Sequence, residues 1–302
     1  MTLEQLRIFV AVAERQHVTR AAHDLRLTQS ATSAAIAALE ARYATKLFDR
    51  IGRRIELTDT GRLFLVEARA VLAQAAAAEA LLDDLAGLTR GTLSLAASQT
   101  VANYWLPPFM HRFRKLYPGI TLQLSIGNTE QVAAWVNEIA VDLGLVEGEV
   151  VNPMLSINPI ATDDLVLVAS PQHVWAHAEK ITPEDLVATP WVLREAGSAT
   201  RAILEGVLTR YGFSIADCTI ALELPSNEAV LTAVADGAGA TIVSEVAARA
   251  RIKAGSLLSR DIGLPRRRFY SLRHKERSLT GAQRAFLDLV THDVGQPQAP
   301  AE

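Results

Sequence analysis

The chain has 302 residues, of which 49% are hydrophobic and 21% charged. This length accommodates about two domains, or three if one is small, and the composition excludes a disordered chain. No run approaches the roughly 18 apolar residues of a membrane helix, and the N-terminal pattern lacks the apolar core of a signal peptide. The single cysteine, Cys218, cannot form an intrachain disulfide, which favours a cytoplasmic location.

Charge is unevenly distributed along the chain. Residues 1–58 contain nine Lys or Arg and six acidic residues, a net charge of +3, whereas the rest contains 21 Lys or Arg and 27 acidic residues, a net charge of −6. Residues 1–58, here called the head, are therefore basic and the rest of the chain is acidic. This asymmetry predicts a polyanionic partner for the head.

The first 58 residues predict three helices and a wing. Thr2 and Gln5 have the spacing of a capping box, before apolar residues at helical spacing. Thr19 is a candidate cap for a short second helix over 20–25, and Thr28 for a third over 29–42. Two short helices so closely connected form a helix-turn-helix. We expect the buried face of the third helix to consist of Thr32, Ile36 and Leu39.

The pattern over residues 47–85 predicts two buried residues, then a turn between short strands, then a long helix. Leu47 and Phe48 are expected in the core, and a glycine-centred turn over 49–57 predicts a wing with arginines at its tip. Thr58 can cap a helix over 59–85. Its alanine-rich apolar face indicates either close dimerisation with a second copy or packing on its own domain. This face comprises Leu63, Val66, Ala70, Ala73, Ala77 and Leu81.

From residue 91 the pattern changes to alternating apolar strands and helices, which predicts parallel strands with crossover connections. We divide the chain into a winged helix-turn-helix (1–58), a linker helix (59–88), a first lobe (91–161 with 267–293), a second lobe (162–266) and a disordered tail (294–302). The predicted fold class is α/β: an all-α winged head and two Rossmann-like lobes similar to those of periplasmic binding proteins.

Motifs across the head resemble those of a known family. The matching segments read FVAVA at 9–13, TRAA at 19–22, QSATS at 29–33, LFDR at 47–50 and LT at 57–58, with Gly61 following. They resemble the DNA-binding region of LysR-type transcriptional regulators. Segments 106–107, 117–119, 142–144 and 234–242 resemble the effector domain of the same family. The resemblance implies a tetramer built from dimers, paired operator half-sites in double-stranded DNA and a co-inducer between the two lobes, and we keep RNA polymerase open as a further partner.

Two positions depart from the family pattern. Many relatives have an arginine within the recognition helix, but residues 30–40 contain no basic residue. A glycine commonly follows that helix, but this chain has Ala44, so we expect the tight turn to be made in another way.

The candidate DNA-binding residues lie on the third helix and in the wing. Amide and hydroxyl side chains near a helix N-terminus suit base edges in the major groove, and exposed arginines suit phosphates. Arg50 could equally have a structural role inside the domain. The predicted DNA-binding set is Gln29, Ser30, Ser33, Arg50, Arg53 and Arg54.

Two segments, residues 98–100 and 197–201, predict an anion site between the lobes. Each combines hydroxyl groups and backbone N–H groups at a predicted strand end and helix start, an arrangement that favours a small carboxylate or inorganic oxyanion. Simple helix capping by Ser98 and Ser198 is the alternative. The segments are most similar to the family branch that regulates sulfur-oxyanion and carbon metabolism. The predicted effector set is Ser98, Gln99, Thr100, Thr129, Glu147, Gly197, Ser198, Thr200 and Arg201.

Other classes of function remain open at this point. An enzyme would use Ser98 or Ser198 as a nucleophile, but neither segment contains a histidine or an elbow motif. His173 and His177 have the spacing of a metal pair, although a solvated helix face is the simpler interpretation. A solute-binding protein fits the two lobes alone, and a ligand-independent repressor or architectural DNA-binding protein fits the head. We expect no catalytic residues, metal or cofactor.

Overall fold

A computed structural model describes residues 1–51, 54–85 and 90–292. The chain divides into two compact units, one of Met1–Gly87 with Glu138–Ala140 and one of Leu88–Asn137 with Val141–Glu302. None of the described helices has both the length and the apolar character needed to cross a membrane. The predicted tail, 294–302, lies outside the described residues.

Three helices begin the first unit, and two of the predicted caps are confirmed. The Thr2 and Gln5 side chains form a capping box, and the Thr28 hydroxyl accepts a hydrogen bond from the backbone N–H of Ala31. The predicted cap at Thr19 is wrong, because the second helix already begins at residue 18 and Thr19 lies inside it. The helices are α1 (Leu3–Arg15), α2 (Val18–Asp24) and α3 (Gln29–Tyr43).

The core of this unit has the predicted composition. Thr32, Ile36 and Leu39 are buried, and so are Leu47 and Phe48. The ring of Phe9 on α1 packs against Phe48 and Phe64, with centroid separations of 5.3 and 4.9 Å. The predicted stripe of α3 is therefore confirmed.

The turn after α3 corrects an expectation. Ala44 adopts the left-handed conformation, with φ 48° and ψ 38°, and Thr45 N–H donates to the carbonyl of Glu40. The turn thus has the geometry that a glycine would give, although a left-handed alanine costs about 1 kcal/mol or more. The chain does not make the turn by another route.

The wing consists of antiparallel strands β1 (Phe48–Ile51) and β2 (Arg54–Leu57), in which Ile51 pairs with Arg54. Thr58 caps α4 (Asp59–Leu85) by accepting from Gly61 N–H at 2.9 Å, as predicted. A Cβ at Gly61 would lie 2.1 Å from the carbonyl oxygen of Leu47, so only glycine fits there.

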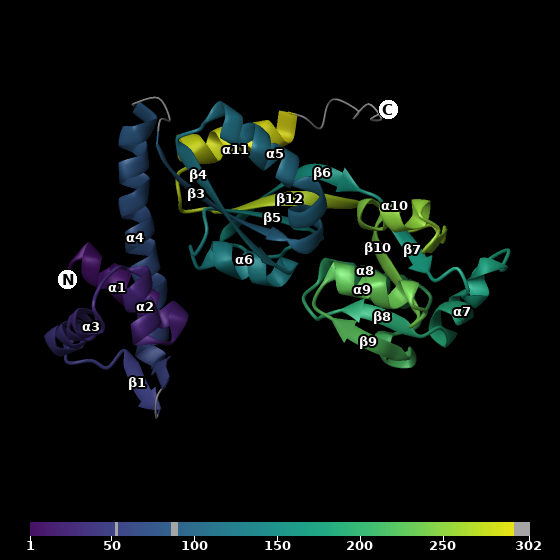
Figure 1. Cartoon of the computed structure of the whole chain (residues 1–302), viewed down its shortest axis with the longest axis horizontal. Coiled ribbons are helices and arrows are strands. Elements are labelled where there is room, and N and C mark those ends of the chain that lie inside the picture. The colour runs from purple at the N-terminus through teal and green to yellow at the C-terminus, as the bar shows by residue number, and fades with distance from the viewer. Residues whose placement is uncertain (52–53, 86–89, 293–302) are drawn as a thin grey trace. The chain divides into compact units, whose positions relative to one another are not determined.

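The first lobe contains a five-stranded sheet in the order β4-β3-β5-β12-β6. Strands β3, β4 and β5 are parallel, and β12 is antiparallel to both of its neighbours. Helix α6 covers one face, and α5 and α11 cover the other (Figure 1). The elements are β3 (Gly91–Ser98), η1 (Val101–Trp105), α5 (Pro107–Leu116), β4 (Ile120–Gly127), α6 (Thr129–Asn137), β5 (Leu143–Glu147), β6 (Leu155–Asp163), β12 (Arg267–His274) and α11 (Gly281–His292).

The second lobe contains a five-stranded sheet in the order β11-β7-β10-β8-β9, with a buried apolar cluster on each face. Trp191 and Leu204 belong to one cluster, and Val192 and Val230 to the other. The elements are β7 (Leu165–Ala169), η2 (Val174–Ala176), α7 (Pro183–Ala188), β8 (Trp191–Arg194), α8 (Ala199–Arg210), η3 (Ile215–Asp217), β9 (Ile220–Leu224), α9 (Asn227–Ala235), β10 (Ala240–Ser244), α10 (Glu245–Lys253) and β11 (Leu258–Arg260).

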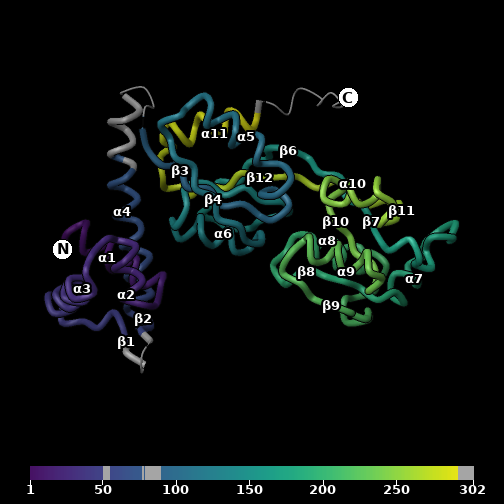
Figure 2. The backbone as a smooth tube through the Cα atoms, viewed as in Figure 1, coloured from purple at the N-terminus to yellow at the C-terminus, as the bar shows by residue number. Residues whose placement is uncertain are grey.

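The chain passes twice between the two sheets, from β6 into β7 and from β11 into β12 (Figure 2). The two crossings lie side by side, because Arg267 pairs with Asp163 in the β12–β6 ladder. Strand β6 contains Pro159, which has no backbone N–H for the ladder. It lies at the sheet edge and its register shifts beside Pro159, which is where proline is tolerated in a sheet.

Candidate functional site

The outward surface of α3 is small and uncharged near its start. Gln29 and Ser30 are exposed, and Ser33 is partly buried. The neighbouring residues Ala31 and Ala34 are also exposed. Their small methyl side chains allow a binding partner to approach the helix backbone closely, so the polar groups of Gln29 and Ser30 can contact that partner.

Some arginines near this helix have no acidic partner. Arg15 and Lys46 are paired, with Asp24 at 2.6 Å and Glu40 at 2.9 Å. Arg20 on α2 and Arg26 before α3 are exposed, and the described residues show no ion pair to either. These two cations are therefore available to a polyanion. The sequence interpretation did not select them, because pairing of charges is not visible in a sequence.

The wing arginines lie at and beside the turn between β1 and β2. Arg50 is in β1 and Arg54 begins β2. Their side chains and the whole of Arg53 lie outside the described residues. The assignment of these three arginines to DNA stays a prediction.

Glu40 joins the end of α3 to the start of the wing. One carboxylate oxygen accepts from the backbone N–H groups of Leu47 and Phe48 at 2.8 and 3.2 Å, and the other accepts from Lys46 Nζ at 2.9 Å. Burial alone would raise the pKa of Glu40, but the hydrogen bonds from Lys46, Leu47 and Phe48 outweigh it and lower the pKa below its ordinary value. Ionised Glu40 thus connects the two predicted DNA-contacting elements.

The two lobes meet through polar side chains. Asn227 Nδ2, from the second lobe, donates to Thr100 Oγ1 of the first at 3.2 Å. Gln99 accepts from Asn227 N–H at 3.1 Å and donates to the carbonyl of Pro225 at 2.6 Å. Gly197 has a left-handed φ of 82°, and a Cβ there would lie 2.5 Å from Glu130 Oε2. Gln99, Thr100 and Gly197 therefore belong to the lobe boundary.

A buried arginine lies where the crossing strands meet both lobes. Arg267 Nε donates to Asp163 Oδ2 at 2.7 Å. Its two terminal nitrogens make only long contacts, 3.5 Å to Thr200 Oγ1, 3.4 Å to Thr100 Oγ1 and 3.9 Å to Glu147 Oε1. The Arg267 side chain is 3% exposed. Its outer N–H groups therefore lack short acceptors in a site removed from water.

Glu147 and its neighbours complete this cluster from the first lobe. The Ser98 hydroxyl donates to Glu147 Oε2, and Thr129 Oγ1 donates to the Glu147 carbonyl at 2.9 Å. Asp163 also accepts from Ser244 Oγ at 2.6 Å. Burial raises the pKa of Asp163, and the Glu147 carboxylate adds to the rise against the opposing effect of Arg267. Capping does not explain Ser98, whose hydroxyl is used by Glu147.

The predicted effector residues thus separate into groups. Ser98, Thr100, Thr129, Glu147 and Thr200 gather around Arg267, which sequence reasoning missed because an arginine that begins a strand gives no sign of burial.

Two predicted residues, Ser198 and Arg201, form neither a hydrogen bond nor an ion pair with Arg267 among the described residues. Ser198 is buried and its side chain makes no capping bond. Arg201 is engaged by Glu205 and Glu223 at 2.9 and 2.6 Å, so its charge is already paired.

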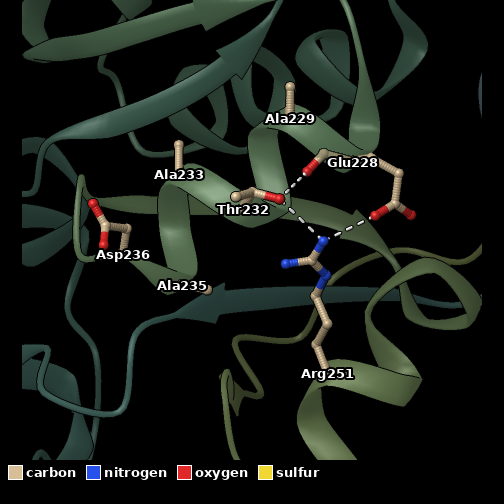
Figure 3. Close-up of a pocket in the computed structure, with 7 residues that line it drawn as sticks. All are labelled: Glu228, Ala229, Thr232, Ala233, Ala235, Asp236 and Arg251. Carbon is tan, nitrogen blue, oxygen red and sulfur yellow. Dashed lines mark hydrogen bonds and ion pairs between the residues drawn. The ribbon is translucent and has the colours of Figure 1, made fainter.

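A separate surface pocket on α9 contains a paired arginine. Figure 3 shows Arg251 reaching Glu228, at 2.9 Å, and Thr232, at 3.1 Å. Glu228 also accepts a hydrogen bond from the hydroxyl of Tyr104 in the first lobe. The Arg251 side chain is 29% exposed against 3% for Arg267, so water screens the attraction of Arg251 for an anion more strongly.

The histidine pair has a local role. His173 Nδ1 caps the short η2 helix by accepting from Trp175 N–H, and its ring packs edge-on against Trp175 at 4.5 Å. The expected solvated helix face is therefore wrong for His173. Within 1–51, 54–85 and 90–292, no group of three His, Cys, Asp or Glu side chains could hold a metal.

Comparison with known proteins decides the family. Residues 3–62 match the model described as bacterial regulatory helix-turn-helix protein, lysR family, and residues 86–294 match the LysR substrate binding domain. The chain belongs to the LysR family. This LysR-family protein is a DNA-binding transcriptional regulator with an effector-binding domain, and the expected fold class is confirmed.

Relatives align over nearly its whole length. The protein is 36% identical over 290 residues to the uncharacterized HTH-type transcriptional regulator YeiE of Escherichia coli, covering 95% of this chain and 96% of YeiE. It is 32% identical over 298 residues to the RuBisCO operon transcriptional regulator of Allochromatium vinosum, covering 98% and 97%.

Solved structures share the fold. Full-length OxyR from Pseudomonas aeruginosa is similar with a TM-score of 0.73 and 21% identity, covering 96% of this LysR-family chain and 94% of OxyR. The regulatory domain of Synechocystis CcmR, in complex with 2-PG, is similar with a TM-score of 0.62 and 27% identity, covering 68% and 98%.

Proposed function

We propose that this regulator responds to a small anion bound between its lobes by Arg267, Thr100 and Thr200. The observation that carries the proposal is the weak hydrogen bonding of the buried Arg267 guanidinium. Among the described residues, its outer nitrogens donate only at 3.5 Å to Thr200 and 3.4 Å to Thr100. A carboxylate or oxyanion in that position would give short charge-assisted hydrogen bonds in place of long ones.

The position of the site provides a route to regulation. Thr100 belongs to the first lobe, Thr200 to the second, and Arg267 begins the crossing strand β12. An anion that contacts all three residues stabilises a closed arrangement of the lobes relative to an open one. The size of this stabilisation is set by the difference between the affinities of the anion for the closed and the open state. Ligand binding would thereby change the effector domain that controls promoter activity.

DNA recognition is proposed to begin at the start of α3. Gln29, Ser30 and Ser33 would enter the major groove, with Arg50, Arg53 and Arg54 on phosphates or in the minor groove. The exposure of Gln29 and Ser30 supports this assignment. Arg20 and Arg26 extend the proposed phosphate-contacting surface.

Helix α4 is proposed to pair two copies. Phe64, Leu65 and Ala68 pack on the core of their own unit, whereas Leu63 and Val66 are 74% and 44% exposed. Apolar side chains exposed on a separate face of a long helix favour a second copy as partner. We propose a homodimer through α4 and a tetramer of two such dimers.

The relatives support a small anionic effector without identifying it. CcmR is described in complex with 2-PG, and its regulatory domain aligns with the two lobes of this chain. Regulators of RuBisCO genes are among the similar proteins, which favours a metabolite over a macromolecule as the ligand.

Thermal unfolding of the full chain with phosphate, sulfate, acetate and glycolate tests the proposal. A ligand specific to the folded state raises the melting temperature with its concentration. Thr200→Val removes one hydroxyl at nearly constant volume and should reduce the shift, whereas Thr209→Val, on the exposed side of the same helix, should leave it unchanged. No shift with any anion, or equal shifts in both variants, would contradict the site.

A further inference from the structure

The proposed anion site contains a negative charge that a simple anion site would lack. The groups that contact Arg267 or its two acidic neighbours come from several elements, and two of them are carboxylates. They are Glu147 from β5, Asp163 from β6, and the hydroxyls of Ser98, Thr100, Thr129, Thr200 and Ser244.

One guanidinium therefore serves two buried carboxylates. Arg267 is 2.7 Å from Asp163 and 3.9 Å from Glu147. The other buried cation nearby, Arg194, is occupied by the carboxylate of Glu195, to which it donates at 2.7 and 2.8 Å. Two carboxylates and one guanidinium give the Arg267 cluster a formal net charge of −1 before any ligand enters. Adding a further negative charge to this buried site is expensive.

The two oxygens of Glu147 are in different states. Oε2 accepts from Ser98, while Oε1 has no hydrogen bond from any described residue and lies beside the outer nitrogen of Arg267. A ligand between Thr100 and Thr200 would therefore meet a cation and a free carboxylate acceptor at once. An oxygen without a proton is repelled by that acceptor, whereas an O–H or N–H group donates to it.

We infer that the cleft selects an anion that carries its own hydrogen-bond donor, such as a protonated oxyanion or a hydroxy- or aminocarboxylate, and discriminates against anions of the same size without one. The inference rests on the proposed function, because it concerns the same site. Arg267 binds the anionic oxygen, and Glu147 Oε1 accepts the donor.

Matched ligands test this on the full chain without any variant. Glycolate and acetate carry the same charge and differ by one hydroxyl, so this pair isolates the donor. Phosphate at pH 6 is mainly a protonated monoanion and sulfate is a bare dianion of similar size, so that pair tests donor and charge together. Isothermal titration should give phosphate and glycolate the higher affinity, by roughly tenfold to a hundredfold, the value of a hydrogen bond to a charged group.

Glu147→Gln assigns the discrimination to one residue. The amide offers donors as well as an acceptor, so the preference for glycolate over acetate should fall at least to near parity, mainly because acetate binds better. Glu184→Gln, at an exposed glutamate of α7, is the matched control and should retain the wild-type preference.

The outcomes separate the two proposals. If glycolate binds no more tightly than acetate and phosphate no more tightly than sulfate, the donor requirement is overturned and the anion site remains supported. An unchanged preference in Glu147→Gln would have the same consequence. Absence of binding by all four anions would overturn both.

Discussion

The contact between Glu40 and the wing predicts a local loss of structure when the carboxylate is removed. Glu40→Ala leaves the backbone N–H groups of Leu47 and Phe48 without the acceptor that now lies 2.8 and 3.2 Å away. An unsatisfied donor that is partly shielded from water costs about 1 to 3 kcal/mol. Taking a total of about 2 kcal/mol, local opening should become roughly thirtyfold more frequent.

Hydrogen exchange measured by mass spectrometry detects local opening of the connection between α3 and the wing. Tryptophan fluorescence does not report on this connection, because all four tryptophans, at 105, 135, 175 and 191, lie in the second unit. Peptides covering 44–50 should exchange roughly thirtyfold faster in Glu40→Ala, in line with the lost hydrogen bonds. Glu67→Ala, at an exposed glutamate on α4, should leave their exchange unchanged.

Glu40→Gln separates charge from hydrogen bonding. The amide oxygen can still accept from the two N–H groups, so the loss near neutral pH should be less than about 1 kcal/mol. The pKa of Glu40 lies below its ordinary value of 4.5 in the folded chain. Its ionised form therefore contributes fully above that pH, and the contribution is lost as the pH falls through the folded-state pKa.

Protection of the α3–wing connection should thus decline in acid in the wild type and not in Glu40→Gln. Equal exchange in the wild type and Glu40→Ala, or the same acid response in the Gln variant, would refute the reasoning.

Three further predictions concern the head. Ala44→Gly should stabilise the turn after α3 by about 0.5 kcal/mol. Glycine removes the strain of a left-handed alanine, but part of that gain is lost because glycine gives the unfolded chain more conformational freedom. Amide exchange in the turn should therefore become slower. Gly61→Ala should destabilise the head by about 1 to 3 kcal/mol and weaken DNA binding, because its Cβ would overlap the Leu47 carbonyl; unchanged exchange in α4 would contradict this. Arg53→Ala should weaken binding to all duplexes and flatten the salt dependence, whereas Gln29→Ala should relax preference at one base position, and equal losses on specific and random DNA would count against Gln29 in the groove.

Local interactions explain where sequence reasoning succeeded. The caps at Thr2, Thr28 and Thr58 depend on residues only three positions away, so their spacing is readable before any fold is known. The buried stripe of α3 follows from helical periodicity in the same way. Strand β6 is harder to infer from local pattern, because Pro159 argues against a strand and the edge position that permits the proline depends on the rest of the sheet.

Long-range pairing decided the ligand site. The local pattern favoured Arg201, which lies beside the Gly-Ser-Ala-Thr segment, but Glu223, distant in sequence, holds that guanidinium. Arg267 meets Asp163, 104 residues away, and Thr100, 167 residues away, through the tertiary fold of the first lobe. The sequence by itself determined the starts of the helices capped at Thr2, Thr28 and Thr58, the alternation of strands and helices and the hydroxyl-rich segments at the lobe boundary. The tertiary structure decided which arginine is buried with only long hydrogen bonds from its outer nitrogens, because burial and charge pairing depend on residues that the chain brings together from far apart.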